Sequence, residues 1–186
     1  YRSTDFLSSI HLARRETSQM LGLFGGQQSL FEYKPWVEVA IAEFDAAAGR
    51  QAEALPVREQ AIVAMRSLVE DYPERVVYRQ EFDLMLHNFA VDRAKVGRRP
   101  DALTAWSEAI VGHERLVAGH PEGVDYASEL ATFLHQRGYL LVASDEDAAG
   151  ADFLRAAETL EALVQKRPDD LSFRMQAGQL QRTAGI

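Results

Sequence analysis

Two histidines in this sequence stand at a spacing that bears on any chemistry it could perform. His87 and His135 are 48 residues apart, and each is followed by an amide residue, Asn88 and Gln136. Imidazoles that face one cavity can act as an acid–base pair or as metal ligands, because the ring titrates near neutral pH and its neutral nitrogen binds metals. The alternative is that histidine is a packing residue that recurs because the chain repeats. The residue types alone leave both interpretations open.

Other motifs that could do chemistry are incomplete. His113-Glu114 begins like the zinc-protease motif, but Val117 occupies the position of the second histidine. Residues 145–147 (Asp-Glu-Asp) followed by Gly150 resemble the start of a calcium loop, but the later oxygen ligands are not at the required spacing. These acids suit a solvated loop and a helix N-terminus instead. No Gly-x-Ser-x-Gly elbow and no phosphate-binding loop with a lysine occurs. The sequence therefore predicts a protein that is not an enzyme and holds no metal or cofactor.

The histidine spacing belongs to an internal repeat of the chain. Residues 68–73 (LVEDYP) return as 116–121 (LVAGHP) and as 163–168 (LVQKRP), which sets the prolines 48 and 47 residues apart. An aromatic residue, Tyr78, Tyr126 or Phe173, follows each proline after five positions. We expect a single repeat domain over residues 1–186, with a partial unit at 1–25, units at about 26–73, 74–121 and 122–168, and a final partial helix at 169–186. The partial units predict that the chain is a piece of a longer protein.

Each unit is predicted to form two helices. A first helix is expected from Tyr126 to Leu141, because apolar residues recur there every three or four positions. A second helix is expected to open at Pro100 and to end before Gly119 and Pro121, since proline is tolerated in a first turn and glycine and proline follow helix ends. No segment alternates with period two over a useful length. The predicted fold class is all-α.

Two features near the N-terminus are predicted separately. Pro56 falls inside the second helix of its unit, so that helix either starts late or bends, because proline lacks an N–H and its ring clashes with the preceding turn. Ser3 or Thr4 can cap a helix whose apolar residues continue to Phe24. This helix would match the second helix of a truncated unit.

The helix pairs resemble the tetratricopeptide repeat family. Gly138 is similar to the small residue of that family's first helix, and the second helices carry its Ala, aromatic, Ala triplet twice, as Ala102, Trp106 and Ala109 and as Ala149, Phe153 and Ala156. The ordinary repeat has 34 residues, whereas this one is similar to the longer repeats found C-terminal to some bacterial serine/threonine kinases, especially in planctomycetes. The resemblance implies a right-handed α–α superhelix of antiparallel helix pairs, completed by stacking of neighbours.

The resemblance also implies which surface binds partners. In this family the first helices usually line a concave groove that accepts an extended peptide or a helix. On that basis the expected partner-binding residues are Asp83, His87, Asn88, Val91, Thr132, His135 and Tyr139. The predicted function is a non-catalytic scaffold that binds a protein segment. The alternatives are a structural linker or dimerisation module, and a helical enzyme that uses His87 and His135.

Composition narrows the partners further. The formal net charge of −8 provides no basic surface for nucleic acid or anionic membranes. No apolar run approaches the roughly 20 residues that span a bilayer, and the chain has no cysteine. We expect a cytoplasmic protein that binds protein or peptide, does not insert into a membrane, and is compatible with homo-oligomer formation.

Overall fold

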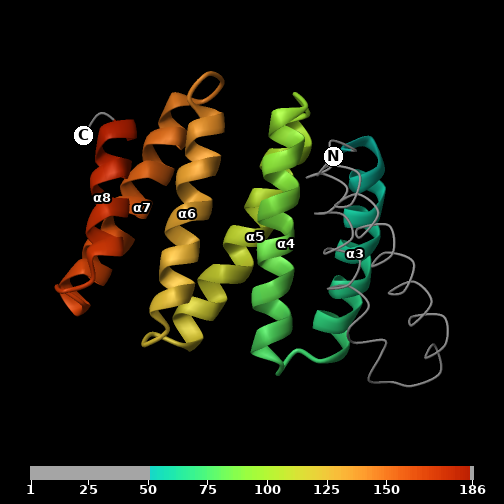
Figure 1. Cartoon of the computed structure of the whole chain (residues 1–186), viewed down its shortest axis with the longest axis horizontal. Helices are drawn as coiled ribbons and strands as arrows, with labels where there is room; N and C mark the ends of the chain where they lie inside the picture. The colour runs from blue at the N-terminus through green and yellow to red at the C-terminus, as the bar shows by residue number, and fades with distance from the viewer. Residues whose placement is uncertain (1–50, 185–186) are drawn as a thin grey trace, which may run out of the picture. The chain divides into compact units, whose positions relative to one another are not determined.

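The computed structural model describes residues 51–184, and this part of the chain consists of α-helices joined by short connections (Figure 1). Its helices are α3 (Gln51–Asp71), α4 (Val76–Lys95), α5 (Arg99–Gly119), α6 (Val124–Leu141), α7 (Glu146–Lys166) and α8 (Leu171–Ala184). No strand occurs between residues 51 and 184. The all-α prediction is therefore confirmed for the described residues. The predicted partial unit 1–25, its capped helix and residues 26–50 lie outside them.

The chain divides into two compact units, residues 1–78 and 79–186, and the division falls inside α4. In the first unit α3 buries Ala61, Met65 and Leu68, and the ring of Tyr72 meets that of Tyr78 edge-on at 6.0 Å between centroids. In the second unit consecutive helices run in alternate directions, and α6, α7 and α8 lie side by side (Figure 1). The arrangement is that of packed, repeat-like helix pairs. The proposed unit boundaries stay a prediction.

Helix ends follow the proline and glycine signals of the sequence. The recurring prolines, Pro73, Pro121 and Pro168, each lie two residues beyond the last residue of α3, α5 or α7. Between α4 and α5, Gly97 has φ +79°, a left-handed conformation that glycine adopts without strain. Because proline disfavours the helical conformation of the residue before it, these helices end there, and the connections that contain the prolines are short.

The structure excludes one of the two alternatives for Pro56. α3 begins before this residue and continues through it to Asp71. The alternative in which the helix starts after the proline is therefore wrong.

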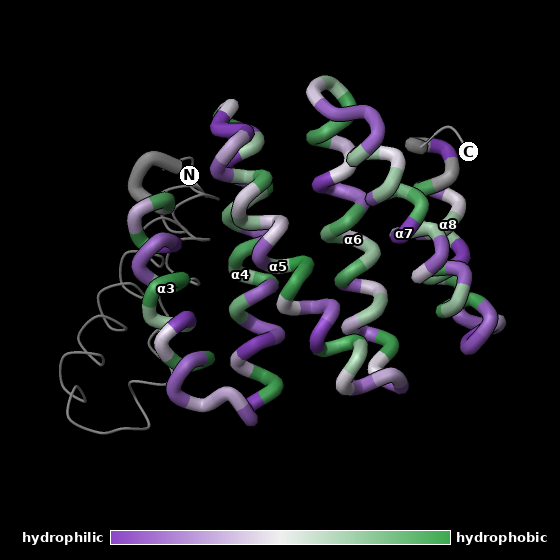
Figure 2. Tube along the Cα trace, turned by 180° about the vertical axis from the view of Figure 1, so that it is seen from behind, coloured by the Kyte–Doolittle hydropathy of each residue, from purple (hydrophilic) through white to green (hydrophobic). Residues whose placement is uncertain are grey.

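The core of the second unit is built from side chains on one face of each helix. Hydrophobic and hydrophilic residues are interspersed along every labelled helix, as expected for helices that bury one face (Figure 2). The predicted aromatic residues Trp106 and Phe153 are both buried. Burial of such side chains stabilises the fold by roughly 1.5 to 3 kcal/mol or more each. Gly138 allows this packing at α7, because a Cβ there would lie 2.9 Å from Phe153 Cε1.

Within residues 51–184, no helix is both long and apolar enough to cross a membrane.

Candidate functional site

The residues predicted on α4 do not form one accessible surface. Asp83 is fully buried, because its carboxylate faces His113 of α5 inside the core. Its assignment to an open groove does not fit this position. Val91 is half-buried, and Asn88 is exposed. Of the predicted α4 residues, Asn88 is thus the one with an exposed side chain.

His87 is held by aromatic neighbours. Trp106 Nε1 donates a hydrogen bond to His87 Nδ1 at 3.0 Å, and the imidazole stacks on Phe133 with 4.7 Å between ring centroids. Burial, with a smaller contribution from the charge of His113, lowers the pKa of His87 to about 4. The ring is therefore neutral at physiological pH. These contacts favour the packing interpretation of this histidine.

His135 occupies the equivalent place on α6 but differs in one respect. Its ring lies beside Phe153, with centroids 5.8 Å apart, as His87 lies beside Trp106. Burial lowers the pKa of His135 as well. However, His135 Nε2 is buried and has no hydrogen-bond partner. The recurrence of histidine thus accompanies the recurrence of an aromatic neighbour, while His135 keeps an unused polar atom.

A groove of about 180 Å³ lies where α6, α7 and α8 meet. Its walls come from the first helices α6 and α8, and Leu160 contributes from α7. The groove is lined by Ala131, Thr132, His135, Gln136, Leu160, Gln176, Gln179 and Leu180. Two predicted partner-binding residues, Thr132 and His135, therefore line a real depression. His87 is not among the lining residues, so this groove does not combine the two imidazoles.

One further predicted residue extends the same face of α6. Tyr139 lies one helical turn after His135 and is 66% exposed. Residues 132, 135, 136 and 139 follow the spacing of one helix face. α6 thus presents a threonine, a histidine, a glutamine and a tyrosine along the groove and beyond it.

The groove is polar but uncharged. None of its lining residues is Asp, Glu, Lys or Arg. Gln176 Oε1 accepts a hydrogen bond from Ser128 Oγ at 3.1 Å, which ties the side chain of α8 to α6. The apolar part of the lining, Ala131, Leu160 and Leu180, is buried. Amide and hydroxyl groups therefore stand above an apolar floor.

Another set of polar groups forms a buried cluster between α4, α5 and α6. His113 Nδ1 lies 3.2 Å from Asp83 Oδ2, and His113 Nε2 lies 2.8 Å from Glu129 Oε2. Gln80 Nε2 also donates to Glu129, at 3.2 Å. Arg79 Nη1 is 3.7 Å from Asp83 Oδ1, which has no hydrogen bond. One imidazole thus bridges two carboxylates across three helices.

The protonation of His113 follows from this geometry. Burial opposes a charge on the ring, but hydrogen bonds to Asp83 and Glu129 and the charges of both carboxylates outweigh it and raise the pKa of His113. Burial raises the pKa of Asp83 as well, although its contacts with His113 and Arg79 oppose that rise. The imidazole of His113 joins α4 and α6 to α5 through its contacts with Asp83 and Glu129.

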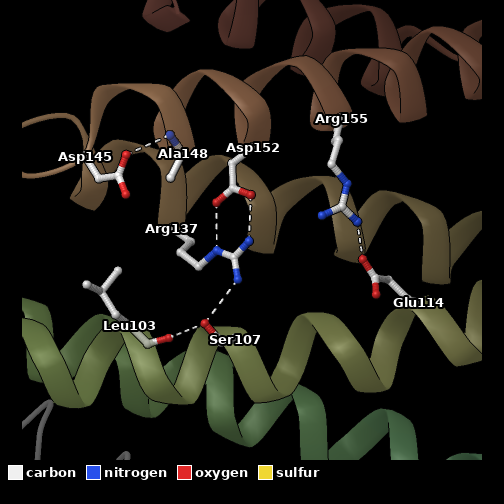
Figure 3. A network of polar contacts seen from close by, with 8 residues as sticks. All are labelled: Leu103, Ser107, Glu114, Arg137, Asp145, Ala148, Asp152 and Arg155. Carbon is white, nitrogen blue, oxygen red and sulfur yellow. Dashed lines mark hydrogen bonds and ion pairs between the residues drawn. The ribbon is translucent and has the colours of Figure 1, made fainter.

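A second ionic cluster joins α6 to α7. Arg137 donates two hydrogen bonds to Asp152, from Nε at 2.7 Å and from Nη2 at 2.6 Å, and a third to Ser107 Oγ of α5 at 3.1 Å (Figure 3). Asp152 is 3% exposed. Figure 3 also shows the exposed pair of Arg155 and Glu114, which joins α7 to α5 nearer the surface.

Sequence reasoning did not identify either cluster. A usable signal existed, because polar residues replace apolar ones at repeat-equivalent positions. Asp83 stands 48 residues before Ala131, and Arg137 stands 48 residues after Phe89. A charge at a position that is apolar in another unit indicates a buried partner, since an unpaired buried charge would be expensive.

The acidic segment 145–147 serves as a helix start. The Asp145 side chain accepts a hydrogen bond from the Ala148 backbone N–H at 3.0 Å, and Glu146 and Asp147 lie in the first turn of α7. The helix N-terminus interpretation is confirmed. Among residues 51–184, no group of three or more His, Cys, Asp or Glu side chains is placed to hold a metal ion.

Comparison of the chain with protein-family models, with curated proteins and with solved structures found no match in any of the three.

Proposed function

We propose that this protein is a scaffold that binds an extended segment of another protein in the groove between α6 and α8. In this proposal the helix pairs belong to a tetratricopeptide-type array, with a right-handed superhelix, in a bacterial cytoplasm. The observation that carries the proposal is the groove itself, whose walls come from two first helices. Repeat-like helix pairs stack so that equivalent helices line one surface, and partners commonly bind there.

The lining chemistry supports a protein segment as the ligand. Gln136 offers an amide group that pairs with a peptide main chain, and the Thr132 hydroxyl, which donates its hydrogen to the Ser128 carbonyl, can accept a hydrogen bond from one. Tyr139 is an exposed aromatic on the same helix face, a residue type that is enriched at binding hot spots. A segment that crosses the groove and packs on Tyr139 would bury apolar area and satisfy its own backbone.

The paired-histidine enzyme has less support. The Nδ1 atom of His87 is engaged by Trp106, and the groove contains His135 without His87. No cavity in the described residues is shown to hold both rings. His135 is better used as one polar group of a binding surface.

Selection of peptides by display against the whole chain tests this proposal. The Kd of the selected binders would then be measured by fluorescence anisotropy. We expect Gln136→Ala combined with Gln179→Ala to weaken binding about tenfold or more. Gln165→Ala is the matched control, because Gln165 is an exposed glutamine of α7 outside the groove lining.

Equal binding to the groove variant and to the control would contradict the proposal. So would a selection that yields no binder to the folded chain. Circular dichroism of each variant shows whether the helices are retained.

A further inference from the structure

The charged side chains of α6 and the uncharged lining of the groove bear on the class of segment it accepts. On α6 the charged side chains nearest the groove residues are Glu129 and Arg137. Glu129 is bonded to His113 and Gln80, and Arg137 points to Asp152 and Ser107 (Figure 3). Both charges are thus used inside the core. The lining retains glutamine, threonine and histidine above its apolar floor.

We infer that the groove selects protein segments whose side chains at the bound positions are uncharged, and that it recognises them through amide and main-chain hydrogen bonds. This inference rests on the proposed function and specifies its ligand.

Amide side chains are suited to this recognition. A glutamine side chain has two donor hydrogens and one acceptor oxygen, the same groups that a peptide bond or an asparagine side chain presents. Gln136 comes from α6 and Gln179 from α8, so a segment between them meets amides on both sides. His135 Nε2, buried and without a partner, adds one more polar atom on the α6 wall. A neutral polar segment presents matching donors and acceptors to the amides of both walls.

A charged side chain would be unfavourable in the groove. A carboxylate or ammonium that enters the groove loses part of its hydration, and no lining residue provides an opposite charge. Binding of a neutral segment also involves little ion pairing, so it should be nearly independent of salt. The uncharged lining therefore predicts two separate properties. The groove should bind charged segments weakly, and the affinity for neutral segments should depend little on salt.

The experiment uses three display libraries that differ at their central positions, which are Asn, Gln, Ser and Thr in one, Asp and Glu in the second, and Lys and Arg in the third. The whole chain is the target. We expect the neutral library to give the tightest binders, with a Kd that changes less than about twofold between about 0.05 and 0.5 M NaCl. Replacement of one central amide of such a peptide by Glu should weaken binding about tenfold or more, and Gln136→Lys should restore much of that loss.

The outcomes separate this inference from the function on which it rests. Acidic or basic binders that lose affinity steeply with salt, and that depend on Gln136 and Gln179, would overturn the inference and leave the binding function intact. Binders from any library that ignore both glutamines would overturn the proposed function, and the inference with it. A Glu-bearing peptide that binds the wild-type chain as well as its parent amide peptide would also refute the selectivity.

Discussion

At the scale of single residues, Gly112 of α5 determines whether Asp83 can be buried. A Cβ on Gly112 would lie 2.3 Å from both carboxylate oxygens of Asp83. Real atoms do not approach so closely, and the carboxylate is held between His113 and α5. A methyl group at this position would therefore separate the charged pair.

Gly112→Ala should destabilise the fold by about 1 to 3 kcal/mol, as overpacking of a filled core does. Gly150→Ala is the control, because Gly150 lies inside α7 and a Cβ added there would have nothing within 4 Å. That change should be neutral or should stabilise by up to about 1 kcal/mol, since alanine favours a helix more than glycine does. Urea unfolding of both variants measures the difference. Equal stability of the two would show that Asp83 has room to move.

The sequence predicts the role of Gly138 but not that of Gly112. The place of Gly138 in the repeat predicts a close contact, and Phe153 does lie against it. Gly112 gives no such signal, because its role depends on Asp83, a residue 29 positions earlier on another helix. Local patterns reveal glycines that every unit needs. They do not reveal a glycine that one particular side chain requires.

At the scale of elements, different side chains of α6 contact α5, contact α7 and line the groove. Glu129 faces the buried histidine of α5, Arg137 faces α7, and residues 132, 135 and 136 line the groove. The bounds of α5 and α6 were predicted to within about two residues, because prolines, glycines and apolar stripes mark them. Their polar contacts were not predicted, since pairing of charges depends on which helices meet.

Arg137→Ala should be strongly destabilising, by about 3 to 5 kcal/mol, because it leaves the buried carboxylate of Asp152 without its partner. Arg155→Ala is the matched control. It removes an arginine from an exposed pair with Glu114 and should change stability by about 0 to 1 kcal/mol. Thermal unfolding of the two variants distinguishes the sites.

A double variant provides the internal check for the same pair. Arg137→Ala combined with Asp152→Ala should be less destabilised than the sum of the single changes, because neither charge then remains unpaired. Simple additivity would show that the contacts between these side chains contribute no coupling.

At the scale of the whole molecule, two histidines of the packed helices, His87 and His113, affect stability in opposite directions as the pH changes. His87 and His113 both pack on Phe133, with 4.7 Å between ring centroids in each case. The pKa of His87 is lowered from 6.5 to about 4, so protonation favours the unfolded chain. The stability that neutral His87 contributes is present above pH 6.5 and is lost as the pH falls toward 4. The pKa of His113 is raised above 6.5, so its contribution is full below that pH and is lost as the pH rises through the raised value.

The free energy of unfolding should therefore be highest near the pH at which an unfolded histidine titrates, about 6.5. His87→Gln should flatten the acidic side of this profile, and His113→Gln should flatten the alkaline side while lowering stability throughout. Urea titrations between about pH 4.5 and 8.5 cover both limbs. An acidic limb that survives His87→Gln would point to other groups, such as His135, whose pKa burial also lowers.

His113 also limits the order in which the helix pairs can follow one another. Its contact with Asp83 lies within the α4–α5 pair, but its contact with Glu129 joins that pair to α6. If the α4–α5 pair and the α6–α7 pair exchanged places along the chain, Asp83 and His113 would move together, and His113 would lose the neighbouring Glu129. Units that share one backbone plan are thus not interchangeable. Contacts between buried polar groups of different helix pairs therefore specify which pair is the neighbour of which.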